Sequence, residues 1–286
     1  MCCAAENIPV EPDLCNYNVG IMKQTFVSLC GAVRAGAPLI HCITNYVAMN
    51  FNANALLAVG ASPVMSACLE ETGELAALCR ALYVNIGCPD SSLIDAAESA
   101  VRHAAELGHP WVLDPVGAGA TSLRTELALK LTGIGRPSII RGNASEILAL
   151  AGHDGRTMGV DSSMAAECAV DSAHTLAKRI GCVVVVSGRT DYITDGERLL
   201  TVENGSPLMC RVSGTGCTAS ALCAAFAAVG KDDLKAAWCA MAMIGVAGER
   251  AASRFRGTGS FQTDMTDELS TADPMAYAAQ IRGNAV

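Results

Sequence analysis

Short apolar runs alternate with longer segments of helical periodicity along most of this chain, and this alternation limits the possible folds more than any other feature. The apolar runs predict strands at 39–43, 82–86, 111–113, 138–140 and 182–186, and a hairpin at 192–194 and 199–202. The helical patterns lie at 46–59, 69–80, 92–106, 121–131, 144–150, 164–180, 215–229, 234–254 and 264–281. Strands that are apolar throughout need helices on both faces of their sheet. The repeated strand–helix order therefore predicts an α/β fold with a mostly parallel central sheet and helices on both faces.

The domain organisation follows from the continuity of this pattern. No linker-like, low-complexity or repeated segment interrupts it, so we expect one domain over residues 26–286. Residues 1–25 contain two prolines, mixed polarity and no clear period, and they predict an irregular N-terminal extension. Aromatic residues make up only 4% of the chain and hydrophobic residues 51%, so small and aliphatic side chains must build the core.

The charge distribution argues against nucleic acid as a partner. The chain carries 20 Lys and Arg against 28 Asp and Glu, a formal net charge of −8, and the basic residues form no stripe. Binding to nucleic acid depends on clustered basic side chains that displace counterions from the phosphates. We therefore expect partners that are small molecules, bound by local groups.

The N-terminus and the cysteines indicate a cytoplasmic protein. Met1, Cys2 and Cys3 are followed by acidic residues, which does not fit a secretory or mitochondrial signal. The 14 cysteines are scattered, mostly inside apolar runs, and they fit small buried side chains in a reducing compartment. The apolar stretches 217–230 and 236–248 are each too short to span a membrane and are separated by charged residues. We expect no membrane association.

Polar and glycine-containing segments follow the predicted strands. They include Asn45 after the first strand, residues 85–87 at the second, Asp114 after the third, 141–143 after the fourth and Ser187 after the fifth. In open α/β sheets, ligands bind beyond the carboxyl ends of the strands. These segments are therefore the first candidates for a binding site.

The Gly214-Thr215-Gly216-Cys217 turn leads directly into an alanine-rich helical segment. Successive backbone N–H groups in such a turn, together with the helix dipole, can bind a phosphate. A glycine-containing loop before a core helix is the alternative. The helix N-terminus is expected to lower the pKa of Cys217, which makes this thiol a candidate nucleophile or a candidate base beside a phosphate. A nucleophilic cysteine would need a nearby histidine, and only His41 lies near a predicted strand end, so the base is favoured.

The Asn143-Ala144-Ser145-Glu146 segment permits two interpretations. Asn143 and Glu146 have the spacing of a capping box at the start of a helix. The same amide and carboxylate could lie near magnesium-bound phosphates, with Arg141 adding positive charge. Asp114 could likewise form a turn before Pro115 or supply a second acid near the metal.

Several longer motifs, in the same order, resemble those of the hydroxyethylthiazole kinase family. They are residues 38–45 (PLIHCITN), 60–65 (GASPVM), 111–120 (WVLDPVGAGA), 140–146 (IRGNASE) and 214–217 (GTGC). The resemblance runs from about residue 36 to about residue 262. It implies a ribokinase-like fold and the phosphorylation of the alcohol of 4-methyl-5-(2-hydroxyethyl)thiazole with ATP and Mg²⁺, in thiamine salvage.

The resemblance also implies roles for single residues at the substrate end of the site. Met65 would line the thiazole pocket together with Gly214 and Asn45. Cys217 occupies the position at which the wider superfamily usually has an aspartate base, although cysteine is common there in this family. The resemblance implies homotrimers with active sites between subunits.

At the nucleotide end, the implied contacts to ATP come from Arg141, Ser187, Thr215 and Gly216. Ser187 departs from the threonine that the family often carries, but it keeps the hydroxyl group. The metal and phosphates would be held by Glu146, Asn143 and Asp114.

Two other functions stay open at this point. One is a ribokinase-like kinase of a different small alcohol, such as hydroxymethylpyrimidine. The other is a binding protein for a thiamine precursor without catalysis, suggested by the weak base at Cys217. Glu146 and Arg141 favour a kinase, because a protein that only binds the precursor needs neither a metal nor a phosphate contact.

Overall fold

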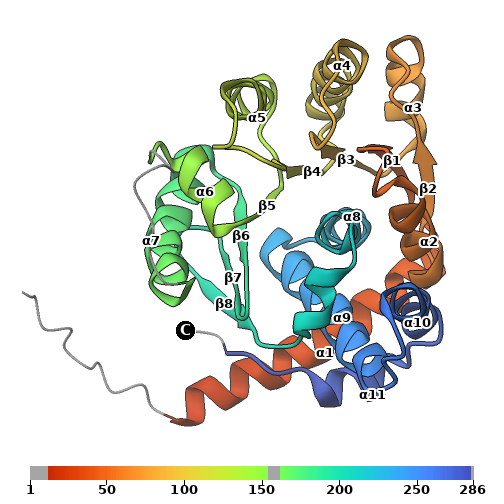
Figure 1. Ribbon diagram of the computed structural model, residues 1–286, viewed down its shortest axis with the longest axis vertical. Coiled ribbons are helices and arrows are strands. Elements are labelled where there is room, and N and C mark those ends of the chain that lie inside the picture. Colours follow the sequence, from red (N-terminus) through yellow and green to blue (C-terminus); the bar gives the residue numbers. More distant parts are fainter. Residues whose placement is uncertain (1–11, 154–161, 285–286) are drawn as a thin grey trace, which may run out of the picture.

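The structure, a computed structural model, describes residues 12–153 and 162–284 of the chain. Within these residues an eight-stranded sheet has the order β2-β1-β3-β4-β5-β6-β7-β8, with β1 to β6 parallel and β7 and β8 antiparallel (Figure 1). The strands are β1 (Leu39–Ile43), β2 (Ser62–Met65), β3 (Ala81–Asn85), β4 (Trp111–Asp114), β5 (Ile139–Asn143), β6 (Val183–Ser187), β7 (Asp191–Thr194) and β8 (Leu199–Val202). The α/β fold predicted from the alternating pattern is confirmed.

Helices cover both faces of the sheet (Figure 1). Residues of α4 to α7 pack on one face and residues of α1, α2 and α8 to α11 pack on the other. The helices are α1 (Pro12–Gly36), α2 (Met49–Val59), α3 (Thr72–Leu78), α4 (Ser91–Leu107), α5 (Ser122–Ile134), α6 (Ala144–Ala151), α7 (Ser162–Ile180), α8 (Thr215–Ala227), α9 (Asp233–Ala252), α10 (Thr258–Ser270) and α11 (Pro274–Gln280), with short 3₁₀ turns η1 (Leu69–Glu71) and η2 (Pro207–Arg211).

Helices α8 and α9 form the centre of the larger core. Nearly every residue of α8 after its first turn is buried, and most of them are alanine. Small side chains allow this helix to lie close to the sheet and to α9, as the aromatic-poor composition predicts. Helix α8 therefore packs against β3 and β4, and its first turn contacts β3 through Tyr83.

Three expectations about local structure were wrong. Helix α1 begins at Pro12, so residues 12–25 are not irregular; residues 1–11, with Cys2 and Cys3, lie outside the described residues. The strand β2 was not expected, because a proline in a short segment usually argues against a strand. The helix expected over 264–281 is two helices, since α10 ends before Pro274, which opens α11.

The apolar stretches 217–230 and 236–248 lie mainly in the buried helices α8 and α9. Among the described helices, none combines the length and the apolar character needed to cross a bilayer.

Candidate functional site

The site lies where the parallel strands end and the chain enters α8. Strands β1 and β3 are neighbours, and the chain leaves them in opposite directions across the sheet, which is where open α/β sheets form ligand crevices. Asn85, Asp114, Asn143 and Ser187 are the last residues of β3, β4, β5 and β6, and Asn45 follows β1 closely. The fold thus brings together residues that are far apart in the sequence.

A chain of hydrogen bonds joins the polar side chains at the ends of β1, β3 and β4. Asn45 Nδ2 donates to Asn85 Oδ1 at 2.8 Å, and Asn85 Nδ2 donates to Asp114 Oδ2 at 2.8 Å. All three side chains are buried, Asp114 being only 2% exposed. Burial raises the pKa of Asp114 to about 6, although the positive charge of Arg141 opposes this shift.

Cys217 lies against this hydrogen-bonded chain. Asn45 Nδ2 is 3.5 Å from Cys217 Sγ, and the Tyr83 hydroxyl donates to the Cys217 carbonyl oxygen at 2.9 Å. Burial, followed by the charge of Asp114, raises the pKa of the Cys217 thiol to about 11. The expectation that the helix N-terminus lowers this pKa was wrong, because loss of water around the thiolate outweighs the helix dipole.

Two glycines of the turn before α8 make close approaches possible. Gly214 has a left-handed φ of 86°, and a Cβ atom there would lie 3.2 Å from the Ala48 side chain. A Cβ atom on Gly216 would lie 2.8 Å from Arg141 Nη1. The described residues give α8 no side-chain cap, so its first backbone N–H groups remain available to a ligand.

Arg141 lies beside this turn. Its Nε atom is buried, and no described residue makes a hydrogen bond to it. A buried guanidinium N–H without an acceptor is costly, so such a group indicates that a ligand completes the site. The acceptor chemistry that suits it best is a phosphate or a carboxylate.

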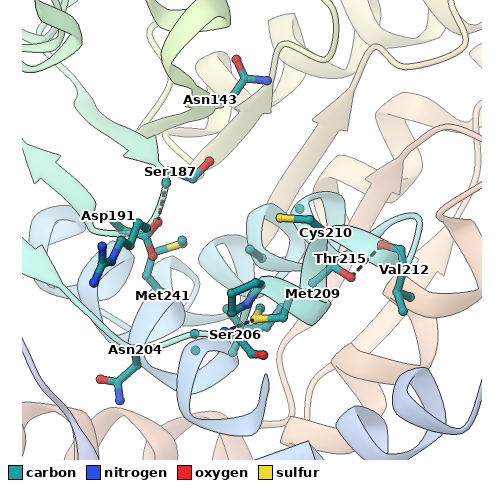
Figure 2. A pocket seen from close by; sticks show the side chains of 18 of the residues that line it. Asn143, Ser187, Asp191, Asn204, Ser206, Met209, Cys210, Val212, Thr215 and Met241 are labelled. Atoms are coloured by element: carbon teal, nitrogen blue, oxygen red, sulfur yellow. Dashed lines mark hydrogen bonds between the residues drawn. The ribbon is translucent and has the colours of Figure 1, made fainter. Parts of the chain in front are cut away.

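A cavity of about 630 Å³ opens next to Arg141 and the turn (Figure 2). Its polar lining includes Arg141, Ser187, Thr215, Asn204 and Ser206. Its apolar lining includes Met209, Val212, Ala219, Met241 and Ile244. A cavity of this kind fits a ligand with an anionic end and a flat apolar part.

Asp191 at the start of β7 shapes the same cavity. Its Oδ1 accepts a hydrogen bond from the Gly188 backbone N–H at 3.0 Å, which closes the turn that follows Ser187. Figure 2 shows this bond beside Ser187. Burial raises the pKa of Asp191 to about 6.

Asn143 and Glu146 form the capping box that their spacing allows. Asn143 Oδ1 accepts from the Glu146 N–H at 3.0 Å, and Glu146 Oε2 accepts from the Asn143 N–H at 2.8 Å. Glu146 Oε1 also accepts from the Gly117 N–H at 2.9 Å, which ties the start of α6 to the loop after β4. Both carboxylate oxygens therefore have a backbone partner, and each retains further acceptor capacity.

The described residues contain no group of three or more His, Cys, Asp or Glu side chains placed to hold a metal ion. Asp114 and Glu146 are close enough for the charge of Glu146 to raise the pKa of Asp114. Mg²⁺ commonly takes one or two carboxylates and completes its shell with water and phosphate oxygens. This pair of acids fits an ion of that kind.

The comparison with known families decides the identity of this fold and site. The model of the hydroxyethylthiazole kinase family matches residues 31–274. The chain belongs to this family. It is therefore a kinase, and the resemblance seen in the motifs is confirmed.

Members of the hydroxyethylthiazole kinase family match over most of their length. The hydroxyethylthiazole kinase of Leptospira biflexa serovar Patoc is 49% identical over 249 residues, which are 87% of this chain and 93% of that protein. The structure of hydroxyethylthiazole kinase from Pyrococcus horikoshii OT3 has a TM-score of 0.85 and 38% identity, covering 92% of this chain and 99% of that one. A ribokinase-like superfamily protein from Enterococcus faecalis V583, 12% identical, shares the fold with a TM-score of 0.61 over 82% of this chain and 88% of that one.

The fold places most of the predicted residues of this kinase around one cavity. Six of them line it, namely Arg141, Asn143, Ser187, Gly214, Thr215 and Gly216. Cys217 and Asn45 contact each other, and Asp114 joins them through Asn85. Met65 ends β2, pairs with Cys42 of β1 and packs on the larger core, outside the lining of this cavity.

Sequence reasoning missed two residues of the site, Tyr83 and Asp191. Tyr83 lies inside an apolar run, and nothing in the run marks it as polar in function. Asn85 was not missed, because the segment 85–87 at the end of a predicted strand was already a candidate for the site. Asp191 follows a Ser-Gly pair after β6, a turn signal that could have been combined with the same rule.

Proposed function

We propose that this protein transfers the γ-phosphoryl group of ATP to the hydroxyl of 4-methyl-5-(2-hydroxyethyl)thiazole, with Mg²⁺ as the metal. The observation that carries the proposal is the buried Arg141 Nε without a protein partner, beside the cavity at the start of α8. A phosphate chain in that cavity would supply the missing acceptor.

The residues divide the reaction into two ends. In the proposal, Arg141, Ser187 and Thr215 contact the nucleotide, and the N–H groups around Gly216 face the γ-phosphate. The thiazole alcohol lies on the side of Asn45 and Cys217, with Met65 and Gly214 completing its pocket. The new bond joins the alcohol oxygen to the γ-phosphorus, the bond to the β–γ bridging oxygen breaks, and ADP leaves with that oxygen.

Cys217 is not a strong base for the proton of the substrate alcohol. With a pKa of about 11, Cys217 is a protonated thiol at neutral pH. Phosphoryl transfer depends mainly on positioning and on neutralisation of phosphate charge, and in the proposal the alcohol proton leaves late in a loose transition state, to an oxygen of the transferred phosphoryl group. We therefore assign Cys217 the role of contacting the alcohol, with a modest contribution to the rate.

Asp114 and Glu146 are the proposed metal-binding acids, with Asn143 near the phosphates. When bound, Mg²⁺ would neutralise negative charge on the phosphate oxygens. The capping box keeps Glu146 and Asn143 in fixed orientations at the start of α6. The hydrogen bonds from Asn85 and Tyr83 do the same for Asp114.

The family resemblance supports the remaining parts of the proposal. These are one kinase domain over residues 26–286, a homotrimer with active sites between subunits, and a cytoplasmic place in thiamine salvage. Sedimentation analysis of the purified protein tests the trimer directly. A monomer with full activity at assay concentration would contradict the shared active site.

The decisive experiment measures ADP release with the thiazole alcohol and, in parallel, with hydroxymethylpyrimidine. We expect turnover with the thiazole alcohol, dependent on Mg²⁺ and abolished by EDTA. Preference for the pyrimidine alcohol would assign a different kinase substrate. Thiazole binding without ADP release in the presence of Mg²⁺ would favour a binding protein. Arg141→Ala is the matched variant, and it should lose ATP affinity and keep thiazole affinity.

A further inference from the structure

The wall of the cavity formed by Asn204, Gly205 and Ser206 has no regular secondary structure of its own. It follows β8, and it is joined through η2 to the turn that opens α8. Asn204 is only 5% exposed, although it lies in a connecting segment. A segment of this kind needs contacts from elsewhere in the molecule to keep one conformation.

Those contacts come from the C-terminal end of α9. Glu249 Oε1 accepts from the Gly205 N–H at 2.8 Å, and Glu249 Oε2 accepts from Asn204 Nδ2 at 3.0 Å. Gly245, one turn earlier on α9, allows the close approach, because a Cβ atom there would lie 2.7 Å from the Asn204 carbonyl oxygen. Both oxygens of the Glu249 carboxylate thus accept hydrogen bonds from the cavity wall.

The C-terminal segment 280–284 holds the same two residues from the other side. The Arg282 guanidinium pairs with the Glu249 carboxylate, its Nη1 lying 3.2 Å from Oε2. The Arg282 N–H donates to Asn204 Oδ1 at 2.7 Å, and Asn204 Nδ2 donates to the Gln280 carbonyl at 3.0 Å. Burial alone would raise the pKa of Glu249, but its bonds to Arg282, Gly205 and Asn204 keep it below the ordinary value.

Backbone pairing with β8 fixes this segment in place. The Thr201 N–H donates to the Asn284 carbonyl at 2.8 Å, and the Glu203 N–H donates to the Arg282 carbonyl at 2.9 Å. Between them lies Gly283, at which a Cβ atom would be 2.0 Å from the Thr201 carbonyl oxygen. The family match ends at residue 274, so this segment lies beyond it.

We infer that Arg282 is a positioning residue for the phosphate-donor pocket, acting through Glu249 and Asn204. This inference rests on the proposed function, because it takes the cavity as the site of ATP. The C-terminal segment sets the affinity for the nucleotide and leaves the thiazole end unaffected, since Asn45 and Cys217 have no contact with it among the described residues.

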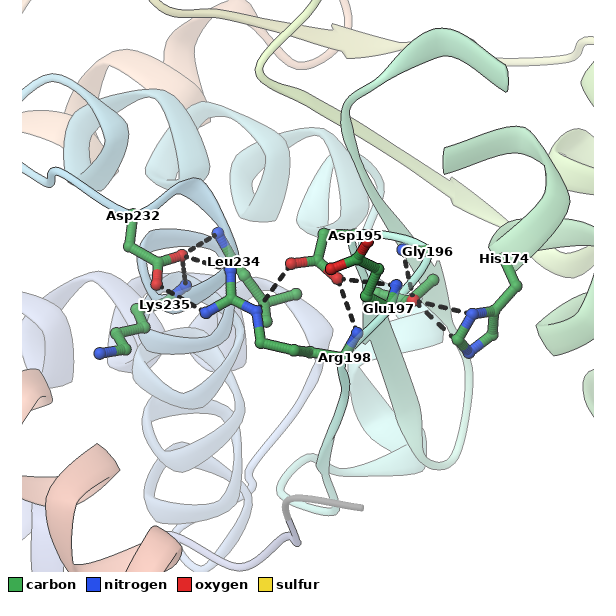
Figure 3. A network of polar contacts seen from close by, with 9 residues as sticks. His174, Asp195, Gly196, Glu197, Arg198, Asp232, Leu234 and Lys235 are labelled. Carbon is green, nitrogen blue, oxygen red and sulfur yellow. Dashed lines mark hydrogen bonds and ion pairs between the residues drawn. The ribbon is translucent and has the colours of Figure 1, made fainter. Parts of the chain in front are cut away.

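A second arginine offers a matched control. Arg198 stands at the other end of β8 and pairs with Asp195 at 2.7 Å and Asp232 at 2.9 Å (Figure 3). Its side chain is 53% exposed and that of Arg282 is 56% exposed. Each arginine side chain binds carboxylate groups next to the same strand, but of the two only Arg282 is connected to the cavity wall, through Glu249.

The experiment compares Arg282→Ala and Gly283→Ala with Arg198→Ala in the full chain. Measured are the KM for ATP, the KM for the thiazole alcohol, kcat, the Kd for ADP by calorimetry and the melting temperature. We expect Arg282→Ala and Gly283→Ala to raise the ATP KM and the ADP Kd roughly three- to tenfold, with kcat and the thiazole KM within about twofold. Arg198→Ala should lower the melting temperature by a similar amount and leave both nucleotide constants unchanged. Arg282→Lys should restore part of the affinity.

Two results would overturn the inference. The first is unchanged nucleotide constants in Arg282→Ala and Gly283→Ala, with a fall in melting temperature equal to that of the control. The second is an equal rise of the ATP KM and the thiazole KM, which would indicate general loosening. Parent protein that binds no ADP would refute the proposed function itself, and the inference with it. Amide exchange at Gly205 gives a readout without turnover and should quicken in both variants.

Discussion

The two halves of the site differ in how far their polar groups are satisfied by the protein itself. On the β1–β3–β4 side, Asn45, Asn85, Asp114 and Tyr83 bind one another and the start of α8. On the β5–β6 side, Arg141 keeps a buried Nε with no described partner next to an open cavity. One half is arranged before any ligand arrives, and the other is completed by its ligand. In the proposed function, the prearranged half holds the alcohol and the metal-binding Asp114, and the open half binds and releases the nucleotide.

Among the variants of the prearranged half, we expect Asp114→Asn to have the largest effect on activity. The amide keeps the shape and one acceptor but removes the charge, so we expect kcat to fall on the order of 10³-fold, with the thiazole KM changed less than about threefold. Steady-state kinetics with both substrates varied measures this. Activity close to that of the parent would remove Asp114 from the metal and phosphate end of the site.

The same variant has a predicted effect on stability. Because the pKa of Asp114 is raised from 3.8 to about 6, its contribution to stability is full below pH 3.8 and is lost as the pH rises through about 6. Asp114→Asn should therefore melt at a higher temperature than the parent at pH 7.5, with the difference shrinking toward pH 4. A constant difference across this range would contradict the raised pKa.

Glu146→Gln tests the border between the two halves. Glu146 accepts two backbone hydrogen bonds, and its charge acts on Asp114, so we expect two effects: a fall in kcat of roughly 10²-fold and a drop in melting temperature of a few degrees, from about 1 kcal/mol for the one acceptor lost. Ser145→Ala, which changes the same turn of α6 and removes no carboxylate, is the control. If the folded fraction of Glu146→Gln keeps full activity, Glu146 has a capping role only.

Met65→Glu tests the proposed thiazole pocket at β2, the edge strand of the sheet. A charge at the end of β2 should raise the thiazole KM by about tenfold and leave the ADP Kd unchanged, because Met65 lies outside the lining of the nucleotide cavity. If the thiazole pocket lies between subunits, sedimentation should also show weaker assembly. A rise in the ADP Kd equal to that of the thiazole KM would contradict the division of the site into two halves.

Cys217 should give the smallest effect. With the thiol protonated at neutral pH, Cys217→Ser and Cys217→Ala should lower kcat by no more than about tenfold, and Cys217→Asp should be at least as active as the parent. The kcat of the parent should show no inflection from this thiol between pH 6 and 8. A stable cysteine adduct in mass spectra during turnover, with both Asp and Ala variants inactive, would show a covalent mechanism instead.

The sequence predicted the sheet well because its strands carry local signals. Buried parallel strands are continuous apolar runs, and the runs at β1, β3, β4, β5 and β6 could be recognised one by one. β2 was not predicted, because it is only four residues long and contains Pro63, which is unusual in a strand away from a sheet edge. In α1, the buried Met22, Phe26, Cys30 and Val33 have helical spacing, so that signal was present and was overlooked.

The site residues that lie within short sequence motifs could be predicted, and those brought together by long-range contacts could not. Arg141, Asn143 and Glu146 share one motif, and Gly214 to Cys217 share another, so both could be selected from the sequence. The pKa of Cys217 could not, because it depends on burial and on Asp114, 103 positions earlier in the chain. The contact between Asn204, Glu249 and Arg282 likewise joins three distant segments, and only the folded chain brings them together.

The two outer strands of the sheet have different means of avoiding other chains. β2 is only four residues long and contains Pro63, which has no N–H to offer a neighbouring strand. β8 has no such residue, and the N–H groups of Thr201 in the strand and of Glu203 just after it donate to the carbonyls of residues 284 and 282. The C-terminal segment therefore also acts as a guard against aggregation. Cleavage after residue 281 would expose a strand edge ready to pair with another molecule, so proteolysis at this end would reduce solubility as well as nucleotide affinity.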